Sequence, residues 1–317
     1  MKETGSTNIN ARVNSAAKSG TGRRSAYRLL EGLKDFSFAL PALAFLVIFI
    51  YYPLVNSFYL SFTNWNMTKP VKQFVGFDNY EKLLTSETFY NVLRITFTYT
   101  VLDVVLTLGF GLLLALLFNV SSRFFNFLRM LLFMPHYISM VIVSMIFLWI
   151  FNSQYGLMNE LLELVGIEKV QWLQNPKTAL WVLIIVSVWK GVGFAMIIFI
   201  AGLRGIPVEY YEASSIDGAS KWTQFWHITL PLLSPITLFL VVTNFISSMQ
   251  VFQSVDIMTN GGPLESTKAM VYWIYTMAFS EFKTGRASAL VIIFFFIIVL
   301  LTMLQMYVSK KKVHYEG

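Results

Sequence analysis

The stretch Ala179–Leu203 reads "ALWVLIIVSVWKGVGFAMIIFIAGL", and Lys190 is its only charged residue. A helix needs about 20 apolar residues to cross roughly 30 Å of hydrocarbon, and this block is long enough. A polar, aromatic-rich stretch follows, which includes "EASSIDGASKWTQFWHITLPLLSP" from Glu212 to Pro235. The whole chain is 56% hydrophobic and 13% charged, which excludes an ordinary soluble domain. The sequence therefore predicts an all-α polytopic membrane protein.

Apolar blocks of the same kind recur along the chain and predict six transmembrane helices. They cover residues 36–60, 95–118, 130–151, 179–203, 232–253 and 287–308. Two shorter apolar segments, 157–167 and 269–280, are too short to cross and are expected to lie at the interface. The expected organisation is a basic, disordered tail at 1–35, a membrane domain at 36–309 with a polar loop at 204–231, and a short tail at 310–317.

The distribution of Lys and Arg predicts the orientation. More than half of the 24 Lys and Arg residues lie in the two tails and in the loops after the second and fourth predicted spans. Cytoplasmic loops carry such an excess, so both termini are expected in the cytoplasm. The net charge of +7 is thus a topology signal, and anionic lipid is a better expected partner than nucleic acid.

Several kinds of chemistry are missing from the sequence. The chain has no cysteine, which excludes disulfides, thiolate catalysis and zinc–thiolate sites. It lacks the G-x-x-x-x-G-K-[ST] pattern that cradles nucleotide phosphates. Its histidines, His136, His227 and His314, are scattered without metal-ligand spacing. We therefore expect no catalytic residue, no metal and no cofactor in this chain, and any energy source lies on a partner.

The polar loop at 204–231 begins with the signals of a short helix. Pro207 suits a first helical turn, and Glu209 and Glu212 are favoured near the positive end of a helix. Gly218 is placed to end that helix in a left-handed conformation. The first half of the loop is therefore predicted to be a helix followed by a turn.

A second short helix is predicted after that turn. Ser220 can cap it, and Trp222 and Trp226, four residues apart, share one of its faces. Pro231 marks the entry into the next span. Such a surface suits a protein partner, but an amphipathic connector resting on the bilayer explains the same residues equally well.

The spacing of this loop resembles a known family. Integral membrane subunits of binding-protein-dependent ABC importers share a cytoplasmic loop with the pattern E-A-A, three residues, G, nine residues, I, one residue, L-P. The matching positions here are Glu212, Ala213, Ser214, Gly218, Ile228, Leu230 and Pro231. Ser214 replaces the second Ala of the pattern. "TNGGP" at 259–263, followed by Gly285, and "FVGFDNYEKLL" at 74–84 are similar to the sugar-importing branch.

The resemblance, which covers residue 36 to the C-terminus, implies a permease subunit of an ATP-driven importer in a bacterial cytoplasmic membrane. The loop would be a coupling helix that docks on an ATPase subunit and transmits its movement in alternating access. The implied partners are a second permease, two ATPase subunits that bind ATP and Mg²⁺, and an extracytoplasmic solute-binding protein. The residues expected to couple are Glu209, Glu212, Ala213, Ser214, Asp217, Gly218, Trp222, Ile228 and Pro231.

Polar residues inside the predicted spans are candidates for a substrate pathway, because they are costly in a membrane. The resemblance implies that sugar contacts come from the spans on either side of the coupling loop. The candidates are Ser187, Lys190, Gly191, Phe194, Asn244, Ser247, Ser248 and Gln250. The alternative is that the Ser and Asn side chains serve helix packing.

Two charged residues stand inside predicted spans, Lys190 and Asp103. They are expected either to pair with each other or a partner subunit, or to leave Lys190 free to meet an anionic group on the cargo, which would favour an acidic sugar. His136 is expected to be structural. An importer of another solute, such as glycerol phosphate, a peptide or an amino acid, remains an alternative, as does a secondary transporter.

Overall fold

The computed structural model describes residues 36, 38–67 and 71–310, apart from the side chains of residues 309 and 310. These residues are helical apart from turns, loops and one isolated antiparallel bridge, which joins Thr63 and Phe74. The chain forms two compact units, the first ending at Tyr59 and the second beginning at Leu60. The tails predicted at 1–35 and 310–317 lie outside the described residues, except for the backbone of residue 310.

The first unit contains most of the first predicted span. A helix runs over Phe38–Ser61 and is long and apolar enough to cross a membrane. It includes a widened turn, η1 (Val47–Tyr51), followed by α2 (Tyr52–Ser61). The widened turn ends two residues before Pro53, which has no N–H to donate to the preceding turn. The proline therefore changes the winding of this helix without ending it.

The second unit contains the other helices of the described chain. In chain order they are α3 (Asp78–Leu84), α4 (Glu87–Phe118), α5 (Arg123–Phe133), η2 (Met134–Tyr137), α6 (Met140–Ile150), α7 (Leu157–Leu164), α8 (Ala179–Gly205), α9 (Val208–Ile216), α10 (Lys221–Gln224), η3 (Phe225–Thr229), α11 (Leu230–Leu232), α12 (Ser234–Met249), α13 (Gln253–Met258), α14 (Met270–Tyr275), η4 (Thr276–Ser280) and α15 (Thr284–Lys310).

Long helices occur where the second, fourth and sixth spans were predicted. They are α4, α8 and α15, and each is long and apolar enough to cross a membrane. The described chain thus contains four candidate spans, or up to six if each of two bent helix pairs is one span. The two segments predicted at the interface form short helices, α7 in the first and α14 with η4 in the second.

The third predicted span, residues 130–151, is a bent pair of helical segments rather than one continuous helix. Helical residues up to Tyr137 are bent by 100° from α6, which starts at Met140. Pro135 lies in the first turn of η2, and the backbone is extended at Ile138 and not helical at Ser139, so the helical hydrogen-bond ladder is interrupted there. The break frees main-chain carbonyls that a continuous helix would use.

The fifth predicted span, residues 232–253, begins at a bend. The segment Lys221–Leu232 is bent by 62° from α12, which begins at Ser234 and ends at Met249 rather than at residue 253. Pro235 lies in the first turn of α12 and cannot donate to the turn before it. This bend separates the polar loop from the apolar helix that follows.

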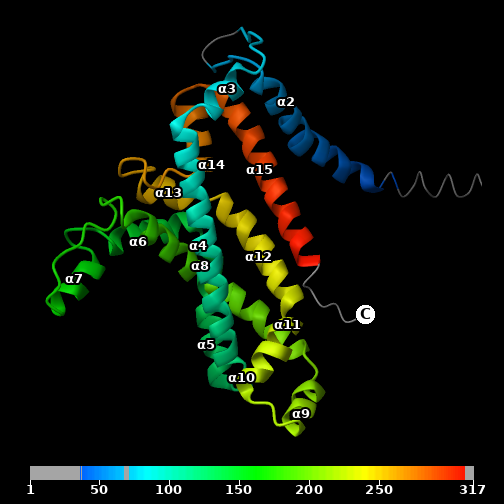
Figure 1. Ribbon diagram of the computed structural model, residues 1–317. Coiled ribbons are helices and arrows are strands. Elements are labelled where there is room, and N and C mark those ends of the chain that lie inside the picture. The colour runs from blue at the N-terminus through cyan, green and yellow to red at the C-terminus, as the bar shows by residue number, and fades with distance from the viewer. Residues whose placement is uncertain (1–35, 37, 68–70, 311–317) are drawn as a thin grey trace, which may run out of the picture. The chain divides into compact units, whose positions relative to one another are not determined.

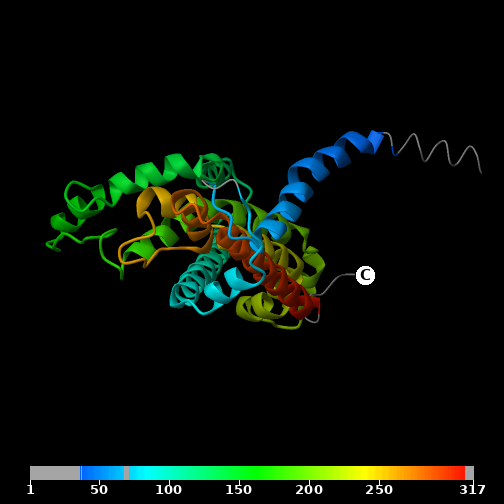
Figure 2. The same cartoon turned by 90° about the horizontal axis from the view of Figure 1, so that it is seen from above.

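The second unit is a bundle in which α4 packs along α8 and α12, while α15 packs on α3, α12 and α14 (Figure 1). Seen from above in Figure 2, α6 and α7 lie on the opposite side of this unit from the end of α15. The contact between α5 and α8 is very close, since a Cβ on Gly193 would collide with the carbonyl group of Leu132. Glycine at this position therefore sets the spacing of the two helices.

A buried arginine fixes the end of α4 to α5. The Arg129 guanidinium donates to the carbonyl of Phe118, to the carbonyl of Val120 at 2.6 Å and to the side chain of Asn126 at 2.8 Å. The last carbonyls of a helix lack partners within the helix, and a cation is favoured at that end. Arg129 satisfies both requirements and so closes the turn between the two helices.

Candidate functional site

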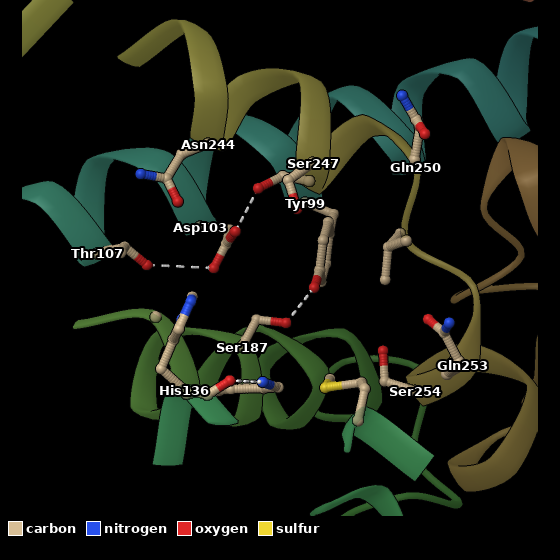
Figure 3. A pocket seen from close by; sticks show the side chains of 15 residues that line it. Tyr99, Asp103, Thr107, His136, Ser187, Asn244, Ser247, Gln250, Gln253 and Ser254 are labelled. Carbon is tan, nitrogen blue, oxygen red and sulfur yellow. Dashed lines mark hydrogen bonds between the residues drawn. The ribbon is translucent and has the colours of Figure 1, made fainter. Parts of the chain in front are cut away.

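A cavity of about 410 Å³ lies within the second unit. Its walls come from α4, α8, α12 and α13 and from the break between η2 and α6, and Figure 3 shows their side chains meeting across it. The lining residues are Tyr99, Asp103, Thr107, His136, Met140, Ser187, Lys190, Gly191, Asn244, Ser247, Ser248, Gln250, Val251, Gln253 and Ser254. Most of them are polar, and they lie within or directly beside apolar helices.

The α4 wall presents Tyr99, Asp103 and Thr107, spaced four residues apart on one helical face. The Thr107 hydroxyl donates to one carboxylate oxygen of Asp103 at 3.4 Å, and the Ser248 hydroxyl of α12 donates to the other. The Tyr99 hydroxyl is hydrogen-bonded to that of Ser187 on α8. The bonds of Asp103 with Ser248 and of Tyr99 with Ser187 join α4 to α12 and α8, and Figure 3 draws them around the cavity.

The hydrogen-bond partner of Lys190 on α8 lies beside the break between η2 and α6. The Lys190 ammonium group donates to the backbone carbonyl of His136, in the last turn of η2, at 2.7 Å. Irregular backbone at membrane depth is tolerated where it lines a cavity, and here it solvates a cation. Within the described ranges no ion pair joins Lys190 to Asp103, so their predicted mutual pairing is absent from this conformation.

The structure brings together the predicted pathway residues with one exception. Ser187, Lys190, Gly191, Asn244, Ser247, Ser248 and Gln250 all line the cavity, whereas Phe194 does not. The Phe194 ring instead stacks on the ring of His136, which lines the cavity, with centroids 4.7 Å apart. Gly191 allows close approach, because a Cβ there would lie 3.2 Å from the Thr107 methyl group. That this cavity is the substrate pathway stays a prediction.

Sequence reasoning did not include the α4 wall or the α13 residues Gln253 and Ser254 among the pathway candidates. The four-residue spacing of Tyr99, Asp103 and Thr107 was a visible signal, since it places three polar groups on one face of an apolar helix. The α13 residues follow a helix end at Met249 that the apolar pattern does not show. No group of acidic residues and histidines in the described part of the chain has a geometry that could hold a metal ion.

The loop between α8 and α12 has the predicted helix–turn–helix geometry. Pro207 is the residue directly before α9, one position ahead of the first turn in which it was predicted, and Gly218 adopts the left-handed conformation with φ +76°. The Ser220 side chain then accepts a hydrogen bond from the Thr223 amide at 3.2 Å and so caps α10. Trp222 and Trp226 share a face with ring centroids 5.7 Å apart.

Gln224 on α10 joins this helix to α9 through hydrogen bonds. The sequence did not predict this role. Gln224 is buried, and its amide donates to the Ser214 hydroxyl at 3.0 Å, the Ser215 hydroxyl at 2.9 Å and the Tyr211 carbonyl at 3.3 Å. Ser214, which departs from the E-A-A pattern, therefore supplies a hydrogen bond that an alanine cannot.

The outer surface of the loop is exposed and partly apolar. Ile216 is 87% exposed and Trp222 is 71% exposed, and Glu209 and Glu212 are exposed beside them on α9. Figure 1 shows α9 at one end of the second unit, away from α13 and α14. Large exposed apolar side chains among carboxylates are typical of a docking surface, and the role of these residues in coupling stays a prediction.

Apolar spans around a polar cavity, together with a folded loop that projects from the bundle, define a multi-pass membrane transport protein. The chain belongs to the family of binding-protein-dependent transport system inner membrane components, whose family model matches residues 107–314. It is therefore the membrane-embedded permease component of an ABC importer and not an enzyme.

Curated relatives agree with this membership. The chain is 37% identical to the probable ABC transporter permease protein YesP of Bacillus subtilis (strain 168), over 90% of this chain and 94% of the relative. It is 31% identical to the trehalose/maltose transport system permease protein MalF of Thermococcus litoralis, over 82% of this chain and 87% of the relative.

A solved structure shares the fold. It is the crystal structure of a bacterial ABC transporter involved in the import of the acidic polysaccharide alginate. One of its chains aligns with a TM-score of 0.79 and 24% identity, over 90% of this chain and 99% of that chain. The likeness shows that the two chains share one fold.

Proposed function

We propose that this chain is a permease subunit of an ATP-driven importer of sugars or oligosaccharides. The observation that carries the proposal is the cavity of about 410 Å³ lined by hydroxyl and amide groups. Such groups match the alternating donors and acceptors of a carbohydrate. A relative named for trehalose and maltose transport supports the same class of cargo.

The mechanism that we propose is alternating access across six spans, with both termini in the cytoplasm. The helix–turn–helix at α9 and α10 would dock on an ATPase subunit, whose closure would move α8 and α12 on either side of the cavity. ATP and Mg²⁺ would bind to two such subunits. A second permease would complete the pathway, and a solute-binding protein, in keeping with the family description, would deliver the cargo.

The cargo that we propose is acidic, because Lys190 lines the cavity and its hydrogen bond goes to an uncharged carbonyl. A positive wall in a cavity attracts an anionic ligand. The same ammonium group also suits a phosphate, so an importer of glycerol phosphate is the second candidate.

Uptake by the complete transporter tests this proposal. Proteoliposomes with all subunits are given a uronic-acid disaccharide, its carboxyl-reduced neutral counterpart or glycerol phosphate. We expect ATP-dependent uptake of the acidic sugar, with Lys190→Met reducing it at least tenfold relative to the neutral sugar. Uptake of glycerol phosphate alone would support the second candidate, and uptake without any ATPase subunit would exclude the ABC mechanism for this chain.

A further inference from the structure

Asp103 is a buried carboxylate on the cavity wall that the proposed transport cycle does not yet use. The residue is 7% exposed, and it comes from α4, outside the two helices that flank the coupling loop. It accepts hydrogen bonds from Ser248 and, at 3.4 Å, from Thr107. No ion pair to Asp103 occurs in the part of the chain that the structure describes.

The hydrogen-bonding capacity of this corner of the cavity is one-sided. A carboxylate has about four acceptor positions and no proton to donate, so Asp103 keeps about two positions free. The hydroxyl protons of Ser248 and Thr107 are already directed to Asp103, so their oxygens can only accept from a ligand. A ligand that fills this corner must bring hydrogen-bond donors.

The wall formed by α8 has the opposite capacity. Lys190 has three donors and no acceptor, and one donor is directed to the His136 carbonyl. The remaining donors require an acceptor, most favourably an anion. Since both residues line one cavity, it pairs an acceptor corner on α4 with a donor region on α8. Figure 3 shows Asp103 facing the space that Asn244 and Ser247 also face.

We infer that Asp103 is a specificity-determining residue whose carboxylate, with the oxygens of Thr107 and Ser248, accepts hydrogen bonds from hydroxyl groups of an acidic sugar. This inference rests on the proposed function and adds an orientation to it. The sugar lies across the cavity, with its anionic group at Lys190 and its free hydroxyls at α4. A buried acceptor left without a donor is costly, so analogues that lack the facing hydroxyl are rejected.

The test combines the removal of one hydroxyl from the sugar with the replacement of one carboxylate in the protein. The complete transporter is assayed with whichever of the uronic-acid disaccharide and its carboxyl-reduced form it takes up, and with the monodeoxy derivatives of that sugar. For the wild type, removing the facing hydroxyl is expected to lower uptake efficiency roughly 10- to 100-fold, the range for a hydrogen bond to a charged group.

In Asp103→Asn, the ratio of uptake efficiency for the intact sugar to that for the deoxy sugar is expected to be at least about threefold smaller than in the wild type. The reason is that the neutral amide makes a weaker hydrogen bond than the carboxylate. Thr107→Val should reduce the ratio in the same direction. Thr100→Val is the matched control on α4, because Thr100 is equally buried but does not line the cavity. An unchanged ratio in both Asp103→Asn and Thr107→Val would show that the carboxylate only joins helices, and would overturn the inference while leaving the proposed function intact.

A second measurement does not depend on transport by the variant. The chain has no cysteine, so Asp103→Cys and Thr107→Cys each provide a single thiol for a small aqueous thiol reagent. We expect the transported sugar to slow labelling at both positions. Absence of protection at both would overturn the inference. Failure of the wild-type complex to take up either sugar would instead overturn the proposed function, and the inference with it.

Discussion

Replacement of Gly218 tests how much the backbone turn in the loop between α8 and α12 contributes to coupling with the ATPase subunit. Gly218 has φ +76°, and a Cβ built on it would meet no atom within 4 Å. Gly218→Ala therefore adds no collision, and its cost is that of a left-handed L-residue, roughly 1–2 kcal/mol. That cost lowers the fraction of loops with this turn by a factor of roughly 5–30.

The assay measures substrate transported per ATP hydrolysed, together with co-purification of the ATPase subunit. We expect Gly218→Ala to reduce both quantities and Gly218→Asn to reduce them less, because Asn tolerates the left-handed region better. Gly218→Pro should be the most severe, since it also removes the amide that donates to the Ser215 carbonyl at 3.1 Å.

Gly205→Ala is the matched control for this series. Gly205 also has open space around a built Cβ, but it is the last residue of α8 and has no positive φ. Normal coupling in Gly218→Ala and Gly218→Pro, with normal ATPase retention, would refute the idea that this turn sets the docking geometry. Equal loss in Gly205→Ala would show that any change in this region disturbs the loop.

Three further outcomes are expected. Gly193→Ala should lower stability by about 1–3 kcal/mol, because its Cβ collides with the main chain of α5, while Gly205→Ala should melt like the wild type in detergent. Arg129→Met should cost at least about 2 kcal/mol in the same melting assay, because it removes charged hydrogen bonds to the end of α4. A single cysteine at Lys221 should resist a membrane-impermeant thiol reagent in intact cells and one at exposed Lys82 should react, and the reverse labelling would contradict the proposed orientation.

The sequence was sufficient to predict the long apolar helices, because twenty or more apolar residues have few other stable arrangements. It also predicted the left-handed Gly218 and the Ser220 cap, since both depend on local backbone chemistry. The break before α6 and the 62° bend before α12 were not predicted. Pro135 and Pro235 were visible, but whether a proline bends or ends a membrane helix depends on what accepts the freed hydrogen bonds nearby.

The cavity could also be predicted only in part from the sequence. Lys190 and Ser248 stood out because polar groups are rare in apolar helices, and the resemblance directed attention to the helices on either side of the loop. The partner of Lys190 was missed, because a backbone carbonyl at a helix break carries no sequence signature. Phe194 was expected in the lining, but its stacking on His136 depends on the bend that places the two rings together.

The close contact at Gly193 limits how this transporter can be re-engineered for a different cargo. Main chain meets main chain there, so the gap between α5 and α8 has no side-chain volume that can be trimmed. Gly111 on α4 is similarly tight, since a Cβ there would lie 2.6 Å from the Cβ of Ala195 on α8. Side chains can still be shortened on α12, where Asn244 and Ser247 line the same cavity. Directed evolution toward larger sugars should therefore randomise α12 and leave Gly111 and Gly193 unchanged.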